Sequence, residues 1–252
     1  MLVDAGADVD ACDVAGYPPV FYAAQQACLE TVQILGNAGC VLYSEIGQSL
    51  LEYVIHLLDY PSEGDDNTNA ALVEHVIRLV AERRQKLTAM ARAVLDSQDL
   101  ARLQLSPQTV LDSKAPLAIS LLQSKVDIPR SLLSHVQCCV YHIERLHPPQ
   151  AQSLWNAGFH DIDEFDRLGQ TPLMKDRRSM VVETSKPREQ LRERFIEWLL
   201  LKGADLHRQQ GYACQQPTQP HGDFVPLQSC KTDRSSATTA LHYLAAFWGK
   251  RL

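Results

Sequence analysis

Cysteine and histidine side chains near the end of the sequence have the chemical types that bind zinc. Cys214, His221 and Cys230, with His207 nearby, offer thiolate and imidazole, the usual donors to this metal. Their spacing contains no paired Cys-x-x-Cys, which favours unrelated loop residues. We therefore predict no metal site there.

A second group of reactive side chains follows the middle of the chain. Cys138 and Cys139 have the types of a redox pair, but adjacent cysteines bridge only with strain, and the apolar residue after them favours packing. His142 and His242 are candidate general bases. The sequence contains no Gly-x-Ser-x-Gly elbow, no phosphate-binding glycine loop and no His-Glu-x-x-His. No enzyme class, catalytic residue or cofactor is predicted.

Carboxylates are dense in one short segment of the chain. Asp161, Asp163, Glu164 and Asp166 resemble a calcium-binding loop in their density, but the glycine and the distal glutamate of the EF-hand spacing are absent. We interpret this segment as a solvated turn without a bound metal.

Composition excludes several classes of function. The chain has 252 residues and a net charge of −6, so it has no overall field that would attract a phosphate backbone. We interpret the short basic runs at 83–86 and 175–178 as a solvated helix face or loop, and predict no nucleic-acid partner. The longest apolar runs are shorter than the roughly 20 residues of a membrane helix. Seven cysteines without a secretory signal favour reduced thiols in an intracellular protein, cytoplasmic or nuclear.

An internal repeat organises the chain. Gly6 and Gly39 are 33 positions apart, and each follows an apolar segment and precedes a loop. Similar runs occur at 154–163 and 199–206. The other half of the unit, a turn that leads into a short helix, is clearest at residues 166–174. There Thr171 can cap the helix, Pro172 occupies the first helical position and Leu173 points inward; weaker copies lie at 13–24 and 238–246.

These segments resemble ankyrin repeats, whose pattern runs through aspartate, glycine, Thr-Pro-Leu-His, paired alanines, an apolar outer helix and Gly-Ala-Asp. The match covers residues 1–42, 151–174 and 195–206; proline replaces the threonine at Pro18, and Phe21 and Met174 replace the histidine. The resemblance implies an all-α solenoid of helix-turn-helix units, each stacked on the next, that binds another protein on its concave face. It also implies that His142 and His242 tie helix starts to neighbouring loops.

Three segments are expected, in an arrangement that resembles ankyrin-repeat proteins of filamentous fungi with helical insertions. Residues 1–58 are degenerate repeats, the first of them truncated; residues 59–137 are a helical insertion or highly divergent repeats; residues 138–252 are further repeats with loop insertions at about 175–186 and 209–233. An inner helix is expected near 47–54 and one long helix over 72–94, with Glu82, Arg83, Arg84 and Lys86 on its outer side. Proline breaks shorter helical pieces at Pro107, Pro116 and Pro129.

The expected function is that of a protein-binding scaffold without a small-molecule substrate or a membrane partner. The resemblance places the contact residues at the tips of the repeats: Asp8, Asp10, Asp13, Tyr17, Asp161, Asp163, Phe165, Asp166, Arg167 and Asp205. One alternative is a purely structural segment of a larger multidomain ankyrin protein. Another is an enzyme with a concave polar pocket in residues 47–137. We also expect a fragment of a longer array, with apolar surface exposed around Leu244, Phe247 and Trp248.

Overall fold

The computed structural model describes six stretches of the chain: residues 3–58, 66–105, 110–133, 139–166, 168–175 and 186–208. Helices, turns and loops make up these stretches, and the β-type pairing within them is one isolated antiparallel bridge between Tyr43 and Ser49. The all-α prediction is confirmed for this part of the chain. None of its helices combines the length and the apolar composition that crossing a membrane requires.

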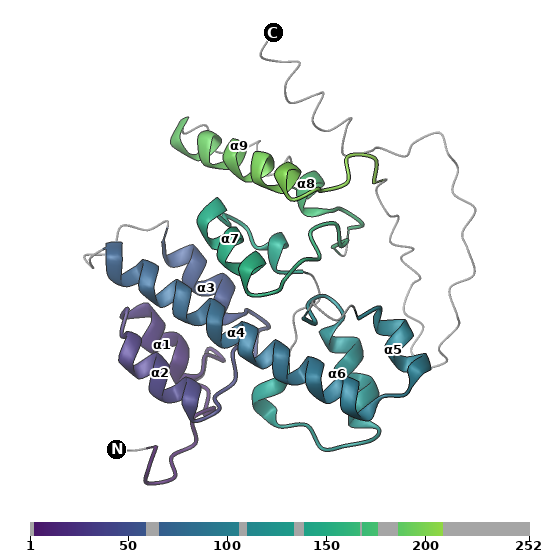
Figure 1. Ribbon diagram of the computed structural model, residues 1–252. Helices are drawn as coiled ribbons and strands as arrows, with labels where there is room; N and C mark the ends of the chain where they lie inside the picture. The colour runs from purple at the N-terminus through teal and green to yellow at the C-terminus, as the bar shows by residue number, and fades with distance from the viewer. Residues whose placement is uncertain are drawn as a thin grey trace.

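Eight of the described helices form two adjacent rows (Figure 1). The inner row consists of α1 (Pro19–Gln25), α3 (Leu50–Leu57), η2 (Val140–His142) and α8 (Pro172–Lys175). The outer row consists of α2 (Leu29–Asn37), α4 (Asp66–Val94), α7 (Pro148–Asn156) and α9 (Lys186–Leu201). In the inner row α1 packs on α3 and η2 on α8; in the outer row α2 packs on α4, α4 on α7 and α7 on α9. Helices α1 and α2 form a hairpin, as do α3 and α4.

The same tight turn precedes three inner-row helices. Its first residue is Asp13, Ser44 or Asp166, and the helix begins six positions later in each case, at Pro19, Leu50 and Pro172. The first residue donates its amide to the carbonyl four positions on, at 3.2, 2.9 and 2.9 Å respectively. A glycine with positive φ completes each turn: Gly16, Gly47 and Gly169. The predicted cap is also present, because Thr171 Oγ1 accepts the amide of Met174 at 3.4 Å.

Glycines also end three outer-row helices. Gly39, Gly158 and Gly203 have φ of 84°, 99° and 88°, after α2, α7 and α9. The amide that follows each glycine donates to the carbonyl five residues earlier, as in Cys40 to Leu35 at 3.1 Å. This is the Schellman motif, which satisfies a carbonyl at the helix end and requires the left-handed conformation that glycine tolerates. The predicted glycine ends are confirmed.

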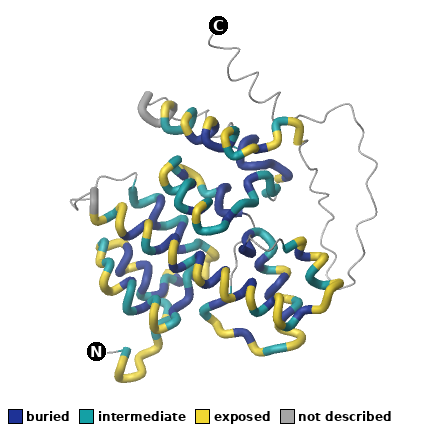
Figure 2. Tube along the Cα trace, viewed as in Figure 1, coloured by how far each residue is buried: buried dark blue, intermediate teal, exposed yellow. Residues whose placement is uncertain are grey.

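Two hydrophobic cores share the long helix α4 (Figure 2). The larger core runs through both rows, from Val20 to Ala204, and includes Ala23 and Ala24 on the buried side of α1. The smaller core joins the second half of α4 to α5 (Ser97–Leu103), α6 (Ala115–Gln123) and η1 (Arg130–Leu132). Pro116, expected as a break, lies in the first turn of α6, where its missing amide costs no helical bond. The single long helix predicted over 72–94 is present, begins six residues earlier at Asp66, and belongs to both cores.

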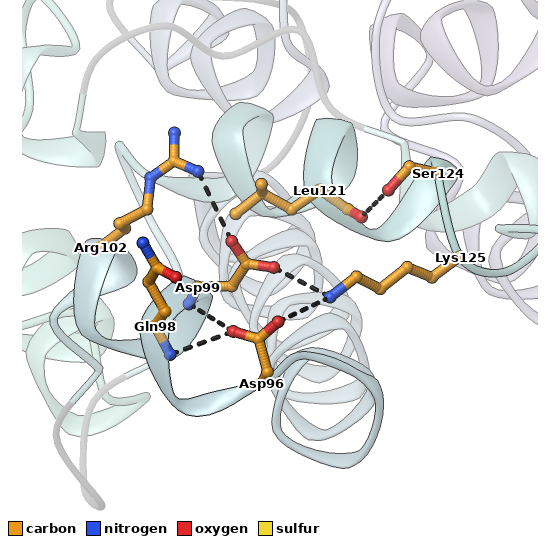
Figure 3. Close-up of polar contacts among 7 residues, drawn as sticks. All are labelled: Asp96, Gln98, Asp99, Arg102, Leu121, Ser124 and Lys125. Atoms are coloured by element: carbon orange, nitrogen blue, oxygen red, sulfur yellow. Dashed lines mark hydrogen bonds and ion pairs between the residues drawn. The ribbon is translucent and has the colours of Figure 1, made fainter.

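An exposed lysine ties two helices of the smaller core together. Lys125 Nζ lies 2.9 Å from Asp99 and 3.3 Å from Asp96 (Figure 3). Asp96 also caps α5 by accepting the amides of Gln98 and Asp99. The hydrogen bond from the Asp99 amide and the nearby Lys125 ammonium lower the pKa of Asp96. This carboxylate pair therefore holds the start of α5 against the end of α6.

The prediction of a solvated basic face at 83–86 is wrong for its two arginines. Arg83 and Arg84 are 8% and 6% exposed, whereas Gln85 and Lys86 are exposed. Arg83 donates to the carbonyls of Cys40, Ser131 and Gly36. Carbonyls at the end of a helix lack helical partners and carry partial negative charge, so the end of α2 provides a favourable site for a buried cation.

Candidate functional site

The first group of predicted contact residues lies in the loop before α1. Asp8 and Asp13 are exposed, and Asp10 and Tyr17 are partly buried. Their carboxylates mainly hold the loop itself: Asp8 accepts the amide of Asp10, and Asp13 accepts the amides of Ala15 and Tyr17. The hydroxyl of Tyr22 also donates to Asp13, and this bond is the main reason for the lowered pKa of Asp13. Tyr17 donates its hydroxyl to Gln48 and packs against the rings of Phe21 and Tyr53.

The second group lies in the loops after α7 and α9. Asp166 accepts the amides of Leu168 and Gln170 at 2.8 and 2.9 Å, which is the arrangement around Asp13. Asp163 accepts the amide of Asp205 at 2.9 Å, and the guanidinium of Arg208 lies 4.9 Å from the ring of Phe165. Asp161 is half-buried, and burial raises its pKa. Arg167 lies outside the described residues.

The expectation of a solvated turn at 161–166 is only partly met. Each of the four carboxylate residues there is partly buried, and burial also raises the pKa of Asp163. Within the stretches that the structure describes, no group of three His, Cys, Asp or Glu side chains could hold a metal. Of the zinc candidates only His207 lies in those stretches; Cys138, His242 and the residues around Trp248 lie outside them.

Aliphatic side chains at the turns are a feature that the sequence analysis missed. Val14, Ile46 and Leu168 are 109%, 66% and 53% exposed, and each sits one or two positions before the turn glycine. We call these three residues the turn tips. The first two turns touch, since the amide of Glu45 donates to the carbonyl of Gly16 at 2.9 Å. An aliphatic residue within each turn sequence was the signal that could have indicated them.

A cavity of about 350 Å³ opens where the inner row is interrupted. Helices α1 and α3 contain 7 and 8 residues, but η2, the next member of the row, contains 3. The cavity lies between α3 and η2 and reaches α4, η1 and the turn at Asp166. Asp166 is the one predicted contact residue among those that line it. None of the first group lines it.

His142 lies at the edge of this cavity and has a structural role. Its Nε2 forms a hydrogen bond with the carbonyl of Glu164 at 2.8 Å, and its own carbonyl accepts Lys175 Nζ at 2.9 Å. Burial lowers the pKa of His142, which favours the neutral ring. The bond between this histidine and a neighbouring loop is the one that the resemblance implied.

A buried acid lies behind the cavity and joins the two cores. Asp112, 1% exposed, accepts the amide of Val140 at 3.0 Å, and burial raises its pKa to about 7 despite the nearby charge of Arg84. Thr88 donates its hydroxyl to the carbonyl of Arg84 and accepts the amide of Leu111. Hydrogen bonds between α4, the smaller core and η2 therefore stabilise the buried side of the cavity.

Comparison with known proteins gives no family assignment. No protein-family model matches the sequence, and no curated protein matches it. The repeated loops, the turn tips and the cavity are therefore the basis for assigning a function.

Proposed function

We propose that the chain is an ankyrin-like solenoid that binds another protein along the edge formed by its turns and inner row. The observation that carries this proposal is the repetition of one loop design. Turns that begin at Asp13, Ser44 and Asp166 make the same backbone bond, and each leads into an inner-row helix after six positions. Stacked hairpins of this kind present an extended surface to a partner.

The polar groups around the cavity favour binding over catalysis. His142 and Lys175 are engaged with backbone carbonyls, and Asp166 with the amides of its own turn. These bonds stabilise the loops and occupy Nε2 of His142, whereas its buried Nδ1 makes no hydrogen bond within the described residues.

The turn tips supply the apolar contacts that a binding edge needs. Val14, Ile46 and Leu168 each leave more than half of their surface exposed, and covering them with a partner would remove apolar area from water. Asp13 and Glu45 directly precede the first two tips in the sequence. The edge thus combines apolar projections with negative charge.

The test replaces all three tips with serine, as Val14→Ser, Ile46→Ser and Leu168→Ser, in the full chain. The control, Leu201→Ser, removes a leucine that is 85% exposed at the end of α9. Affinity isolation from cells of the source organism should recover partners with the wild type and the control but lose them with the triple variant. Equal recovery by all three would overturn the proposal and favour the purely structural segment.

A further inference from the structure

The cavity between α3 and η2 belongs to the same edge as the turns. Tyr43 and Gly47 line it from the second turn region, and Asp166 lines it from the turn before α8. A partner segment that runs along this edge therefore crosses the cavity mouth. The cavity has a volume of about 350 Å³, at the lower end of the range for ligand pockets. This volume suits one long side chain of a partner and the residues next to it.

Apolar side chains form most of the wall. Leu51 and Val80 contribute from α3 and α4, Leu132 from η1, and Val140 and Ile143 from η2 and the residue after it. Such a wall suits the aliphatic stem of an arginine or lysine as well as it suits a purely apolar side chain. The charged residues around the cavity distinguish a basic partner side chain from a purely apolar one.

The lining charges that reach solvent are mainly negative. They are Glu52, Glu144, Asp166 and Lys175. Lys175 donates to the carbonyl of His142, and Asp166 accepts two amides of its own turn. The carboxylates of Glu52 and Glu144 make no hydrogen bond or ion pair within the described stretches. Two carboxylates are thus left to receive a cation from outside.

Two buried arginines, Arg83 and Arg84, also line the cavity, and each has polar neighbours inside the protein. Arg83 donates to three backbone carbonyls, and the charge of Arg84 lies near the buried Asp112. Each is less than a tenth exposed. Because these buried arginines also line the cavity, a cationic head group would stay at the mouth, near Glu52 and Glu144, which reach solvent.

We propose that this cavity receives an arginine or lysine side chain of the bound partner, with its stem against the apolar wall and its head between Glu52 and Glu144. The inference rests on the proposed function, since it names the partner chemistry at one point of that edge. It assigns a basic segment to the partner, consistent with the acidic residues that directly precede the first two turn tips in the sequence.

The test measures binding of blocked tripeptides to the isotope-labelled full chain by nuclear magnetic resonance. The probes are leucine-arginine-leucine and the same peptide with norleucine or glutamate in the middle. The arginine peptide should shift the resonances of Val140 and Ile143, and it should bind less tightly as salt is raised. Glu52→Gln with Glu144→Gln should weaken it about tenfold, whereas Glu30→Gln, on the exposed surface of α2, should leave it unchanged.

Glutamine at position 52 keeps the helix start intact, because Ser49 caps α3 by accepting the amide of residue 52. Unchanged circular dichroism and unfolding curves would establish that the variant folds. Equal binding of the norleucine peptide, or tighter binding of the glutamate peptide at the same resonances, would overturn the inference. If the turn-tip variant loses the cellular partner while the double glutamine variant keeps it at full affinity, the proposed function stands and this inference fails.

Discussion

The amide of Val41 donates to a carboxylate oxygen of Asp10, 31 positions earlier, at 2.6 Å. The amide of Asp205 makes the equivalent bond to Asp163 at 2.9 Å. Both amides lie two residues beyond a helix-ending glycine, Gly39 or Gly203. Each bond joins one loop to the next, so the same device fixes the spacing of neighbouring hairpins at both ends of the described structure.

Replacing Asp10 with alanine will destabilise the fold. The variant Asp10→Ala leaves the Val41 amide without its acceptor, and Val41 is buried, so we expect the free energy of unfolding to fall by about 1–2 kcal/mol. Asp8→Ala is the control, because Asp8 is exposed and bonds only two residues away. Urea unfolding followed by circular dichroism measures both. Equal losses would mean that the link between loops contributes nothing beyond local structure.

Two turn glycines should differ in their sensitivity to alanine. Gly16 and Gly47 have φ of 80° and 84°, so a side chain strains both backbones similarly, by about 1 kcal/mol. A Cβ at Gly16 would also lie 3.1 Å from Glu45 Cβ, whereas a Cβ at Gly47 would meet nothing within 4 Å. Gly16→Ala should therefore lower the midpoint of thermal unfolding more than Gly47→Ala. The reverse order would argue against the contact between the first two turns.

Local signals explain how much of the fold could be predicted. Glycine before a loop and proline at a helix start act through the backbone of their own segment, so Gly39, Gly203 and Pro172 marked the structure that surrounds them. The helical stripe of residues 72–94 likewise needed only its own periodicity. Each of these features depends only on residues of its own segment, so it could be predicted without knowing which distant residues pack against it.

Long-range packing explains what could not be predicted. Arg83 is buried because it donates to carbonyls at the end of α2, more than 40 positions away. No local sequence pattern indicates that contact. The cavity arises because η2 is shorter than its neighbours in the inner row, which a helical stripe does not reveal. The predicted contact carboxylates lie in loops, and six of the seven use one oxygen to accept a backbone amide. The exposed groups there include Val14 and Ile46.

Arg83 should be far more sensitive to substitution than its neighbour in sequence. Arg83→Met keeps much of the aliphatic volume but leaves the carbonyls of Cys40, Ser131 and Gly36 without this donor, so we expect a loss of about 2–4 kcal/mol in unfolding free energy. Lys86→Met, on the exposed side of α4, should stay within about 0.5 kcal/mol of the wild type. Guanidinium unfolding measures both. If Arg83→Met is as stable as the wild type, water molecules must satisfy the carbonyls at the end of α2 in place of the guanidinium.

The buried carboxyl of Asp112 should make stability depend on pH. Its pKa is raised to about 7 in the folded chain, above the value of about 4 expected when unfolded, so the folded state retains its proton longer. Stability from this group is therefore greatest below about pH 4, falls as the pH rises toward 7, and is constant above that. The total change is on the order of 4 kcal/mol if Asp112 titrates alone.

The variant Asp112→Asn isolates this effect, because its amide oxygen can still accept the Val140 amide but cannot ionise. Unfolding free energies at pH 5 and pH 8 should differ less in the variant than in the wild type. Other groups, including His142, Asp161 and Asp163, titrate in both proteins and cancel in the comparison. Asp127→Asn, on an exposed loop, should reproduce the wild-type difference. If the Asp112 variant does so too, the carboxyl does not change its charge between pH 5 and pH 8, and the raised pKa is wrong.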